Sequence, residues 1–121
     1  MAARERLICA AEAVRDGGEG VRFEVDAADG PVAAFVVRHG GRVYAYLNRC
    51  AHVPVELDWV AGQFFDLTGQ WLMCAVHGAH YDPRDGRCVL GPCKGRRLHA
   101  VPVRERAGGI YLVAEVGDGE E

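Results

Sequence analysis

Two short cysteine–histidine pairs are the part of the sequence best suited to metal chemistry. Cys50 and His52 form the first pair, and Cys74 and His77 form the second, with residues 53–73 between them. Thiolate sulfur and imidazole nitrogen both bind transition metals, but a zinc finger usually groups two cysteines and then two histidines. Here each pair offers one sulfur and one nitrogen. This mixed pattern favours a two-iron cluster in which two cysteines hold one iron and two histidines hold the other.

Further residues continue the pattern in a fixed order along the chain. Residues 46–50 read Tyr-Leu-Asn-Arg-Cys before the first histidine, and residues 77–83 read His-Gly-Ala-His-Tyr-Asp-Pro from the second. A Gly-Pro-Cys segment at residues 91–93 and a Val-Pro-Val segment at residues 101–103 follow. A single Cys-x-His pair occurs easily by chance, but this ordered set resembles the Rieske iron–sulfur proteins over about residues 6–115.

The resemblance implies a fold. It implies an all-β protein, built as an antiparallel β-sandwich base with a small cluster-binding subdomain inserted at about residues 47–98. Residues 1–121 would then form a single Rieske domain.

The resemblance also implies a cofactor and its ligands. The cofactor is a Rieske-type [2Fe–2S] cluster, in which Cys50 and Cys74 hold the inner iron while His52 and His77 hold the outer iron near the surface. His80 stands close to the second pair, but the Cys-x-x-His spacing selects His77 as the ligand.

The apolar pattern of the sequence supports a β fold independently. Residues 21–25 alternate apolar and polar side chains, which is typical of a half-buried strand. A Gly-Gly pair joins two β-rich runs and favours a tight hairpin, because both turn positions can take positive φ. No window predicts an amphipathic helix beyond a turn near residues 10–14. The expected hairpins pair residues 33–38 with 42–47, residues 63–66 with 70–74, and residues 98–104 with 110–115.

Composition limits the class of protein. The chain has 121 residues, of which 50% are hydrophobic and 26% are charged, and this is typical of one soluble globular domain. A net charge of −3 gives no sign of nucleic-acid binding. The apolar run at residues 7–14 is interrupted by Glu12 and is too short to span a membrane, which needs about 20 apolar residues. We therefore expect a cytoplasmic protein without a membrane anchor.

Three cysteines are left over from the predicted ligand set. Cys9 is expected to pack as a small core residue. Cys88 and Cys93 are five positions apart, so a disulfide or redox role is an open alternative, but the rarity of persistent disulfides in the cytosol argues against it. Aromatic residues on either side of the second hairpin are expected in the core; these are Trp59, Phe64, Phe65 and Trp71.

Two positions near the second pair predict a low reduction potential. The high-potential branch of the resembled family carries a serine that bonds a cluster sulfide, and this chain has Ala79 there. It keeps Tyr81, whose hydroxyl is expected to reach a ligand cysteine. Hydrogen bonds to sulfur favour the reduced cluster, so the loss of one predicts a potential near the bottom of the Rieske range, roughly −150 mV.

Basic residues outnumber acidic ones in residues 82–97, although the chain as a whole is acidic. This segment is either a rim that steers an acidic partner toward the cluster or an ordinary solvated loop. The basic residues are Arg84, Arg87, Lys94, Arg96 and Arg97, against Asp82 and Asp85.

Together these features predict a Rieske-type ferredoxin that carries one electron from a flavoprotein reductase to a terminal oxygenase or another redox enzyme. The chain is too short to add the mononuclear-iron domain of an oxygenase, so it is not expected to be an enzyme by itself. One alternative is a small Rieske subunit of a nitrite reductase-like complex. Another is a zinc-stabilised interaction module without a redox role.

Overall fold

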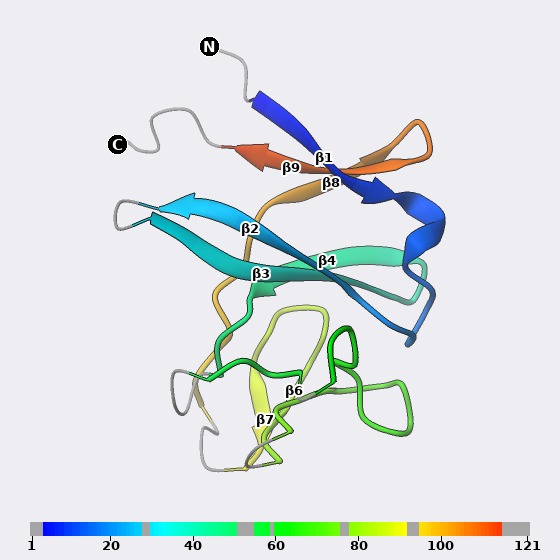
Figure 1. The fold of residues 1–121 in the computed structure, drawn as a ribbon. Coiled ribbons are helices and arrows are strands. Elements are labelled where there is room, and N and C mark those ends of the chain that lie inside the picture. The colour runs from blue at the N-terminus through cyan, green and yellow to red at the C-terminus, as the bar shows by residue number, and fades with distance from the viewer. Residues whose placement is uncertain are drawn as a thin grey trace.

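The computed structural model describes residues 4–27, 30–50, 55–58, 60–75, 78–91 and 95–114. The described residues form three antiparallel sheets stacked one above another (Figure 1), with strand orders β1-β9-β8, β2-β3-β4 and β5-β6-β7. One 3₁₀ turn, η1 (Ala11–Ala13), follows the first strand. The strands are β1 (Arg4–Ala10), β2 (Val21–Ala27), β3 (Gly30–His39), β4 (Arg42–Leu47), β5 (Leu72–Met73), β6 (His80–Tyr81), β7 (Cys88–Leu90), β8 (Val103–Arg106) and β9 (Gly109–Ala114).

The middle sheet is buried on both faces. Successive side chains of a strand point to opposite faces, so Phe35 and Val37 of β3 pack into the lower core while Ala34 and Val36 pack into the upper core. All four are fully buried. A strand that is covered on both faces reads as a continuous apolar run, which is why residues 34–37 show no polar alternation.

The upper and middle sheets form the predicted β-sandwich base, and the all-β fold is confirmed. Residues 33–38 and 42–47 pair as β3 and β4 around the Gly-Gly turn. Gly40 and Gly41 take φ values of 60° and 83°, as a tight hairpin requires. Ala107 and Gly108 make the equivalent turn between β8 and β9, with φ values of 50° and 79°.

Three expectations for the strands need correction. β1 was not predicted, since its apolar residues show no clear alternation; it pairs with β9 and its register shifts after Leu7. Residues 63–66 are not a regular strand but keep part of the expected hairpin: Phe65 bridges Leu72, and the amides of Asp66 and Met73 donate to the carbonyl oxygens of Trp71 and Phe64 at 2.8 Å. Residues 98–102 precede β8, and Ala100 bridges to Tyr46 of β4 rather than continuing the β8–β9 hairpin.

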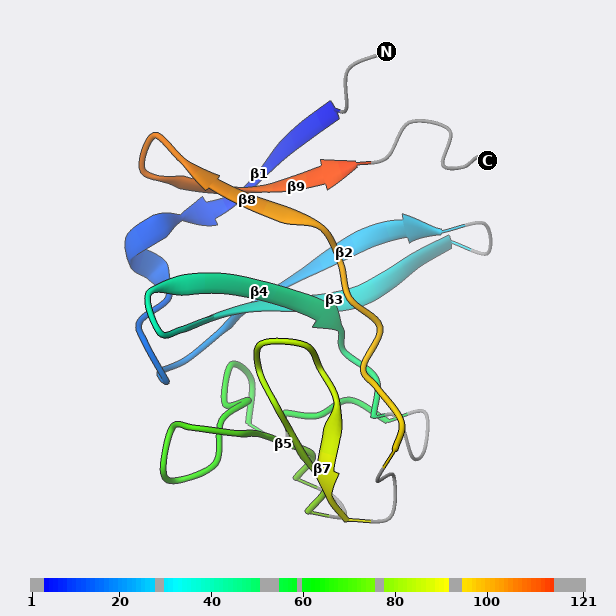
Figure 2. The same ribbon diagram turned by 180° about the vertical axis from the view of Figure 1, so that it is seen from behind.

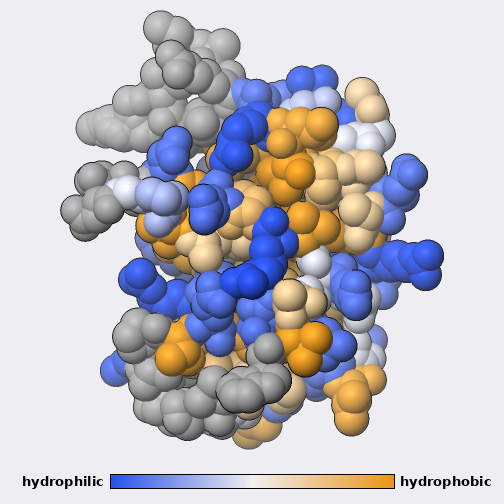
Figure 3. Space-filling model, in the orientation of Figure 1, coloured by the Kyte–Doolittle hydropathy of each residue, from blue (hydrophilic) through white to orange (hydrophobic). Residues whose placement is uncertain are grey.

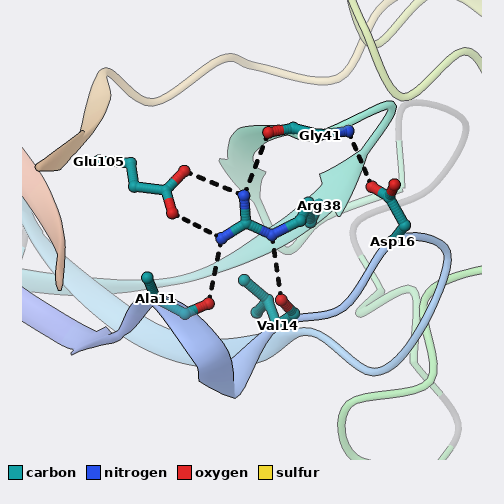
Figure 4. Close-up of polar contacts among 6 residues, drawn as sticks. All are labelled: Ala11, Val14, Asp16, Arg38, Gly41 and Glu105. Carbon is teal, nitrogen blue, oxygen red and sulfur yellow. Dashed lines mark hydrogen bonds and ion pairs between the residues drawn. The ribbon is translucent and has the colours of Figure 1, made fainter. Parts of the chain in front are cut away.

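Arg38 of β3 ties the upper and middle sheets together (Figure 4). Its guanidinium donates to both carboxylate oxygens of Glu105 on β8, at 3.0 and 2.8 Å. It also donates to the carbonyl oxygens of Ala11, Val14 and Gly41 at 3.0–3.1 Å. The planar guanidinium fork therefore joins three segments that are distant in sequence: the β3–β4 hairpin, residues 11–14 and β8.

The lower sheet lies between β4 and β8 in the chain and beneath the middle sheet in both ribbon views (Figures 1 and 2). Phe64 stacks on Phe35 of β3, with ring centroids 3.9 Å apart. The buried hydroxyl of Tyr46 on β4 donates to the carbonyl oxygen of Pro83 at 2.6 Å. These contacts fix the segments that carry the predicted ligands to the underside of the base.

Candidate metal centre

The two predicted cysteine ligands lie in one buried core. Cys50 follows the end of β4, and Cys74 directly follows β5. The two residues are 3% and 0% exposed, and both belong to the lower core cluster. The structure thus brings together two cysteines that are far apart in sequence, at the ends of strands as the sequence predicted.

Backbone hydrogen bonds close a short loop after each cysteine. The amide of Cys50 donates to the carbonyl oxygen of Val55 at 2.8 Å, and the amide of Cys74 donates to that of Ala79 at 2.8 Å. Each predicted histidine therefore falls in sequence within a loop whose two ends are tied together. His52 and His77 themselves lie outside the described residues.

Tyr81 of β6 reaches from the lower sheet to the first loop. Its side chain is fully buried, and its hydroxyl oxygen lies 3.2 Å from Sγ of Cys50. This confirms the expectation that Tyr81 reaches one of the predicted cysteine ligands. With Cys50 as a thiolate, the phenolic O–H is the donor, because a thiolate has no proton to give.

The end of the second loop lies close to Gly91. Ala79 is fully buried, and a side chain at Gly91 would place its Cβ 2.9 Å from Cα of Ala79. Gly91 also takes a φ of 108°, so only glycine fits this close approach without strain. Ala79 supplies no hydroxyl at this position, as noted from the sequence.

His80 is held by groups other than a metal. Its Nδ1 lies 2.7 Å from the carbonyl oxygen of Gly78, and its Nε2 lies 3.5 Å from Oδ2 of Asp66. Burial alone would raise the pKa of Asp66, but hydrogen bonds from Thr68 and from the Trp71 amide bring it below its usual value. The pairing with Asp66, which the sequence did not predict, agrees with His80 being a neighbour of the ligands.

Sequence reasoning also missed two buried polar residues near the loops, Asn48 and Asp58. A signal was available for Asp58, because it stands between Leu57 and Trp59 where an apolar side chain would be expected.

The other residues named from the sequence divide into several groups. Cys9 is partly buried against the upper core, and burial raises the pKa of its thiol. Cys88 is buried in the lower core, with its Sγ 3.5 Å from the carbonyl oxygen of Leu90.

Phe64 is buried as expected and Phe65 is partly buried, whereas Trp71 is 36% exposed, so its assignment to the core was wrong. Trp59, Cys93 and Lys94 lie outside the described residues.

The chemistry of the donor set fits a thiolate-bound cluster. Two cysteines in an apolar core can hold negative charge only if a cation or hydrogen bonds compensate it. Iron provides such compensation, and the Tyr81 hydroxyl adds a hydrogen bond to one of the sulfurs. The backbone hydrogen bonds that close each loop hold the two cysteines in place.

No helix within the described ranges has the length and apolar character needed to cross a membrane.

Comparisons with known proteins are consistent with this geometry. Residues 5–106 match the sequence profile of the Rieske [2Fe-2S] domain. The oxidoreductase NdmD of Pseudomonas putida is 32% identical over an alignment of 87 residues, and the match covers 66% of this chain but only 14% of that protein. The chain therefore spans about one seventh of the length of this curated relative.

Two solved structures share the fold over nearly the whole chain. One belongs to the complex of reduced oxygenase and oxidised ferredoxin in carbazole 1,9a-dioxygenase, with 23% identity, a TM-score of 0.69 and coverage of 92% of this chain and 94% of that chain. The other is the ferredoxin of Sphingomonas yanoikuyae B1, with 22% identity, a TM-score of 0.69 and coverage of 93% and 100%.

Proposed function

The chain belongs to the Rieske [2Fe-2S] domain family, and on this basis we propose that it is a Rieske-type ferredoxin. It carries one electron from a flavoprotein reductase to a terminal oxygenase. The observation that carries the proposal is the burial of Cys50 and Cys74 in one core, with the Tyr81 hydroxyl 3.2 Å from Sγ of Cys50.

Four side chains hold the cofactor in this proposal: Cys50, His52, Cys74 and His77. When bound, a Rieske-type [2Fe–2S] cluster accepts and releases one electron at a potential above that of plant-type ferredoxins. The cysteines would hold the inner iron from within the core, and the histidines would hold the outer iron, from which an electron would pass to a partner. The cluster-binding subdomain comprises about residues 47–98.

The chain's own residues exclude water from the inner side of the site. Leu57, Leu72 and Ala79 are fully buried beside the two cysteines. Low polarity around the sulfurs strengthens the hydrogen bond from Tyr81. The site can therefore keep a fixed shape in both oxidation states, which suits rapid electron transfer.

The similar structures support a role as a carrier. One is a ferredoxin and the other a complex of a ferredoxin with its oxygenase, and this chain covers 100% and 94% of the two matched chains. We further propose a cytoplasmic location, supported by the odd number of five cysteines, which suits a reducing compartment better than a disulfide framework.

The first experiment tests the cluster and its ligands. Purified protein should contain about two irons per chain and no zinc, and should show an EPR signal of low average g-value only after dithionite reduction. Cys74→Ser should abolish the signal. Cys88→Ser is the matched control, because Cys88 is buried in the same core and a serine hydroxyl can still donate to the Leu90 carbonyl. One zinc and no EPR signal would instead support the zinc-stabilised module.

The second experiment tests electron transfer. With NADH, a flavoprotein ferredoxin reductase and cytochrome c as acceptor, the wild-type protein should increase cytochrome c reduction in proportion to its concentration. Cys74→Ser should add nothing. A wild-type protein that shows the EPR signal but does not accelerate the reaction would contradict the carrier role while leaving the cluster assignment intact.

A further inference from the structure

Two buried polar side chains, Asn48 and Asp58, lie between the loops of the site without belonging to the proposed ligand set. Asn48 is 4% exposed and Asp58 is 8% exposed, and the side chain of Asp58 has no solvent-accessible surface. Burying a carboxylate is costly unless hydrogen bonds or an opposite charge compensate it. A buried carboxylate at this place therefore indicates a role that offsets its cost.

Both oxygens of the Asp58 carboxylate accept hydrogen bonds. Nδ2 of Asn48 donates to Oδ1 at 3.0 Å, and the backbone amide of Gly62 donates to Oδ2 at 3.0 Å. Nε of Arg22 on β2 lies 3.5 Å from Oδ2. The Asn48 amide is fixed at its other end as well, since its Oδ1 accepts from the Leu57 amide at 2.8 Å.

These contacts connect the base to both ligand loops. Asn48 follows the end of β4 and precedes Cys50 by two residues. The carbonyl oxygen of Leu57 accepts from the amide of Ala75 at 3.0 Å, and Ala75 directly follows Cys74. A continuous series of hydrogen bonds therefore runs from Asn48 through Leu57 to Ala75. Its two ends lie close in sequence to the two predicted cysteine ligands.

We propose that Asp58 is a positioning residue for the cluster: through Asn48 and Leu57 it fixes the spacing of the two ligand loops, and its buried charge lowers the reduction potential. The inference depends on the proposed cluster being bound by these loops, but not on the identity of any partner. Reduction adds negative charge to the site, and a nearby anion in a medium of low dielectric opposes it.

Arg22 offsets this charge only in part. Its side chain is 41% exposed, and it also pairs with Glu56 at 2.6 Å. The Glu56 side chain is 48% exposed, so solvent screens its charge far more than that of Asp58. Glu56 and Asp58 thus form a natural comparison, in which two carboxylates share one arginine and only one of them is buried.

Three variants separate positioning from plain stability. The two oxygens of the Asp58 side chain accept from the Asn48 side chain and from the Gly62 amide. Asp58→Asn replaces one of these oxygens with an N–H₂ group, so a donor then faces a donor. The double variant Asn48→Asp/Asp58→Asn removes this mismatch: the amide at position 58 donates to the carboxylate at position 48, accepts from Gly62, and leaves an oxygen at position 48 for the Leu57 amide. Glu56→Gln removes an exposed charge beside the same Arg22.

EPR spectra and redox titration of the iron-loaded proteins test the inference. Asp58→Asn should broaden the signal of the reduced cluster, raise the midpoint potential and speed iron loss to a chelator by about tenfold. The double variant should restore the wild-type line width and lower the potential again. Glu56→Gln should match the wild type in all three measurements.

Three results would overturn the inference. An iron-loaded Asp58→Asn protein with the wild-type line width and midpoint potential would show that Asp58 only stabilises the fold, even if the melting temperature of the variant fell. A double variant as broad as the single variant, with equal iron loading, would show that the hydrogen-bond series does not position the loops. A wild-type protein without any Rieske signal would overturn the proposed function and this inference together.

Discussion

At the scale of single residues, Tyr81 is the polar group that most directly touches the proposed ligands. Its hydroxyl lies 3.2 Å from Sγ of Cys50 inside the lower core, where no solvent competes for the hydrogen bond. A hydrogen bond to a ligand sulfur stabilises the reduced cluster, because reduction increases the negative charge on the sulfurs.

Tyr81→Phe should therefore lower the midpoint potential while leaving the iron content unchanged. Redox titration followed by EPR measures both quantities, and the wild-type value itself is predicted near −150 mV, roughly the lower end of the Rieske range. Tyr46→Phe is the control, since the equally buried hydroxyl of Tyr46 donates to the Pro83 carbonyl rather than to a sulfur. A wild-type potential well above zero would contradict the low-potential prediction.

At the scale of elements, glycines decide how closely the loops can approach the base. Gly86 takes a φ of 78°, and a Cβ there would lie 2.8 Å from the ring of Tyr46. Gly40 has a similar φ of 60° in the β3–β4 turn, but a Cβ there would meet nothing within 4 Å. Alanine substitutions at these two glycines therefore separate the cost of backbone strain from the cost of crowding against Tyr46.

Gly40→Ala should cost about 1 kcal/mol of unfolding free energy, the usual cost of a left-handed conformation for a residue with a Cβ. Gly86→Ala should cost about 3 kcal/mol, because overpacking against Tyr46 is added to the same strain. Urea denaturation of both variants measures the difference. Equal losses would show that the loop at residues 82–87 can move away from β4 at little cost.

The Arg38–Glu105 pair makes the stability of the base depend on pH. The hydrogen bonds from Arg38 hold the pKa of Glu105 below its usual value, although burial opposes this shift. A carboxyl group with a lowered pKa in the folded state stabilises the fold above its unfolded pKa, and this contribution is lost as the pH falls through the folded pKa.

Glu105→Gln should thus reduce the unfolding free energy by about 1 kcal/mol at neutral pH. The difference from wild type should stay constant down to about pH 5 and shrink below about pH 4, since free glutamate titrates near pH 4.3. Thermal denaturation across this range measures it. Glu12→Gln, at an exposed position in η1, should show no such dependence, and a constant difference for Glu105→Gln down to pH 3 would contradict the assignment.

At the scale of the whole molecule, charge is distributed unevenly. The chain carries a net charge of −3, yet the bridge between residues 87 and 97 places Arg87 opposite Arg97, both exposed. Like charges directly across a strand pair repel each other, and an acidic partner would relieve this repulsion. Arg84 adds little to the net positive charge of this surface, because its guanidinium donates to both carboxylate oxygens of Asp82.

On the face seen in Figure 3, the described residues of the lower part form no continuous apolar patch. Figure 3 shows apolar side chains gathered over the upper sheet, whereas the visible lower part carries them as separate spots among polar residues. Leu67 and Leu90 are exposed in that lower part of the chain. Among the described residues, the basic segment at 82–97 has three exposed arginines besides Arg84, namely Arg87, Arg96 and Arg97, while Lys94 lies outside the described residues.

Arg87→Glu/Arg97→Glu should slow electron exchange with an acidic partner about tenfold at low ionic strength, and the effect should fade as salt screens the charges. Stopped-flow reduction by the flavoprotein reductase, over a range of ionic strengths, measures this. Arg15→Glu/Arg42→Glu makes the same change in net charge on exposed residues of the base. If both double variants slow the reaction equally, the rim has no specific role.

The sequence by itself determined the class of fold and the cofactor, and it is the source of the proposed ligand loops, because each of these rests on local information. The order of Cys, His, Gly and Pro residues identifies the loops, and the Gly-Gly turn at residues 40–41 identifies the central hairpin. The sequence pattern did not predict β1. This strand pairs with β9, so the pairing joins the two ends of the described chain, and no local pattern encodes such a distant partner.

Only the tertiary structure decided which polar groups serve the site. It placed Asp58 and Asn48 in the interior and linked them to both ligand loops, it turned Trp71 partly to solvent, and it joined Arg38 to Glu105. Burial and hydrogen bonding arise from segments that meet only after folding, and the energy of a polar side chain depends on that environment more than on its neighbours in sequence.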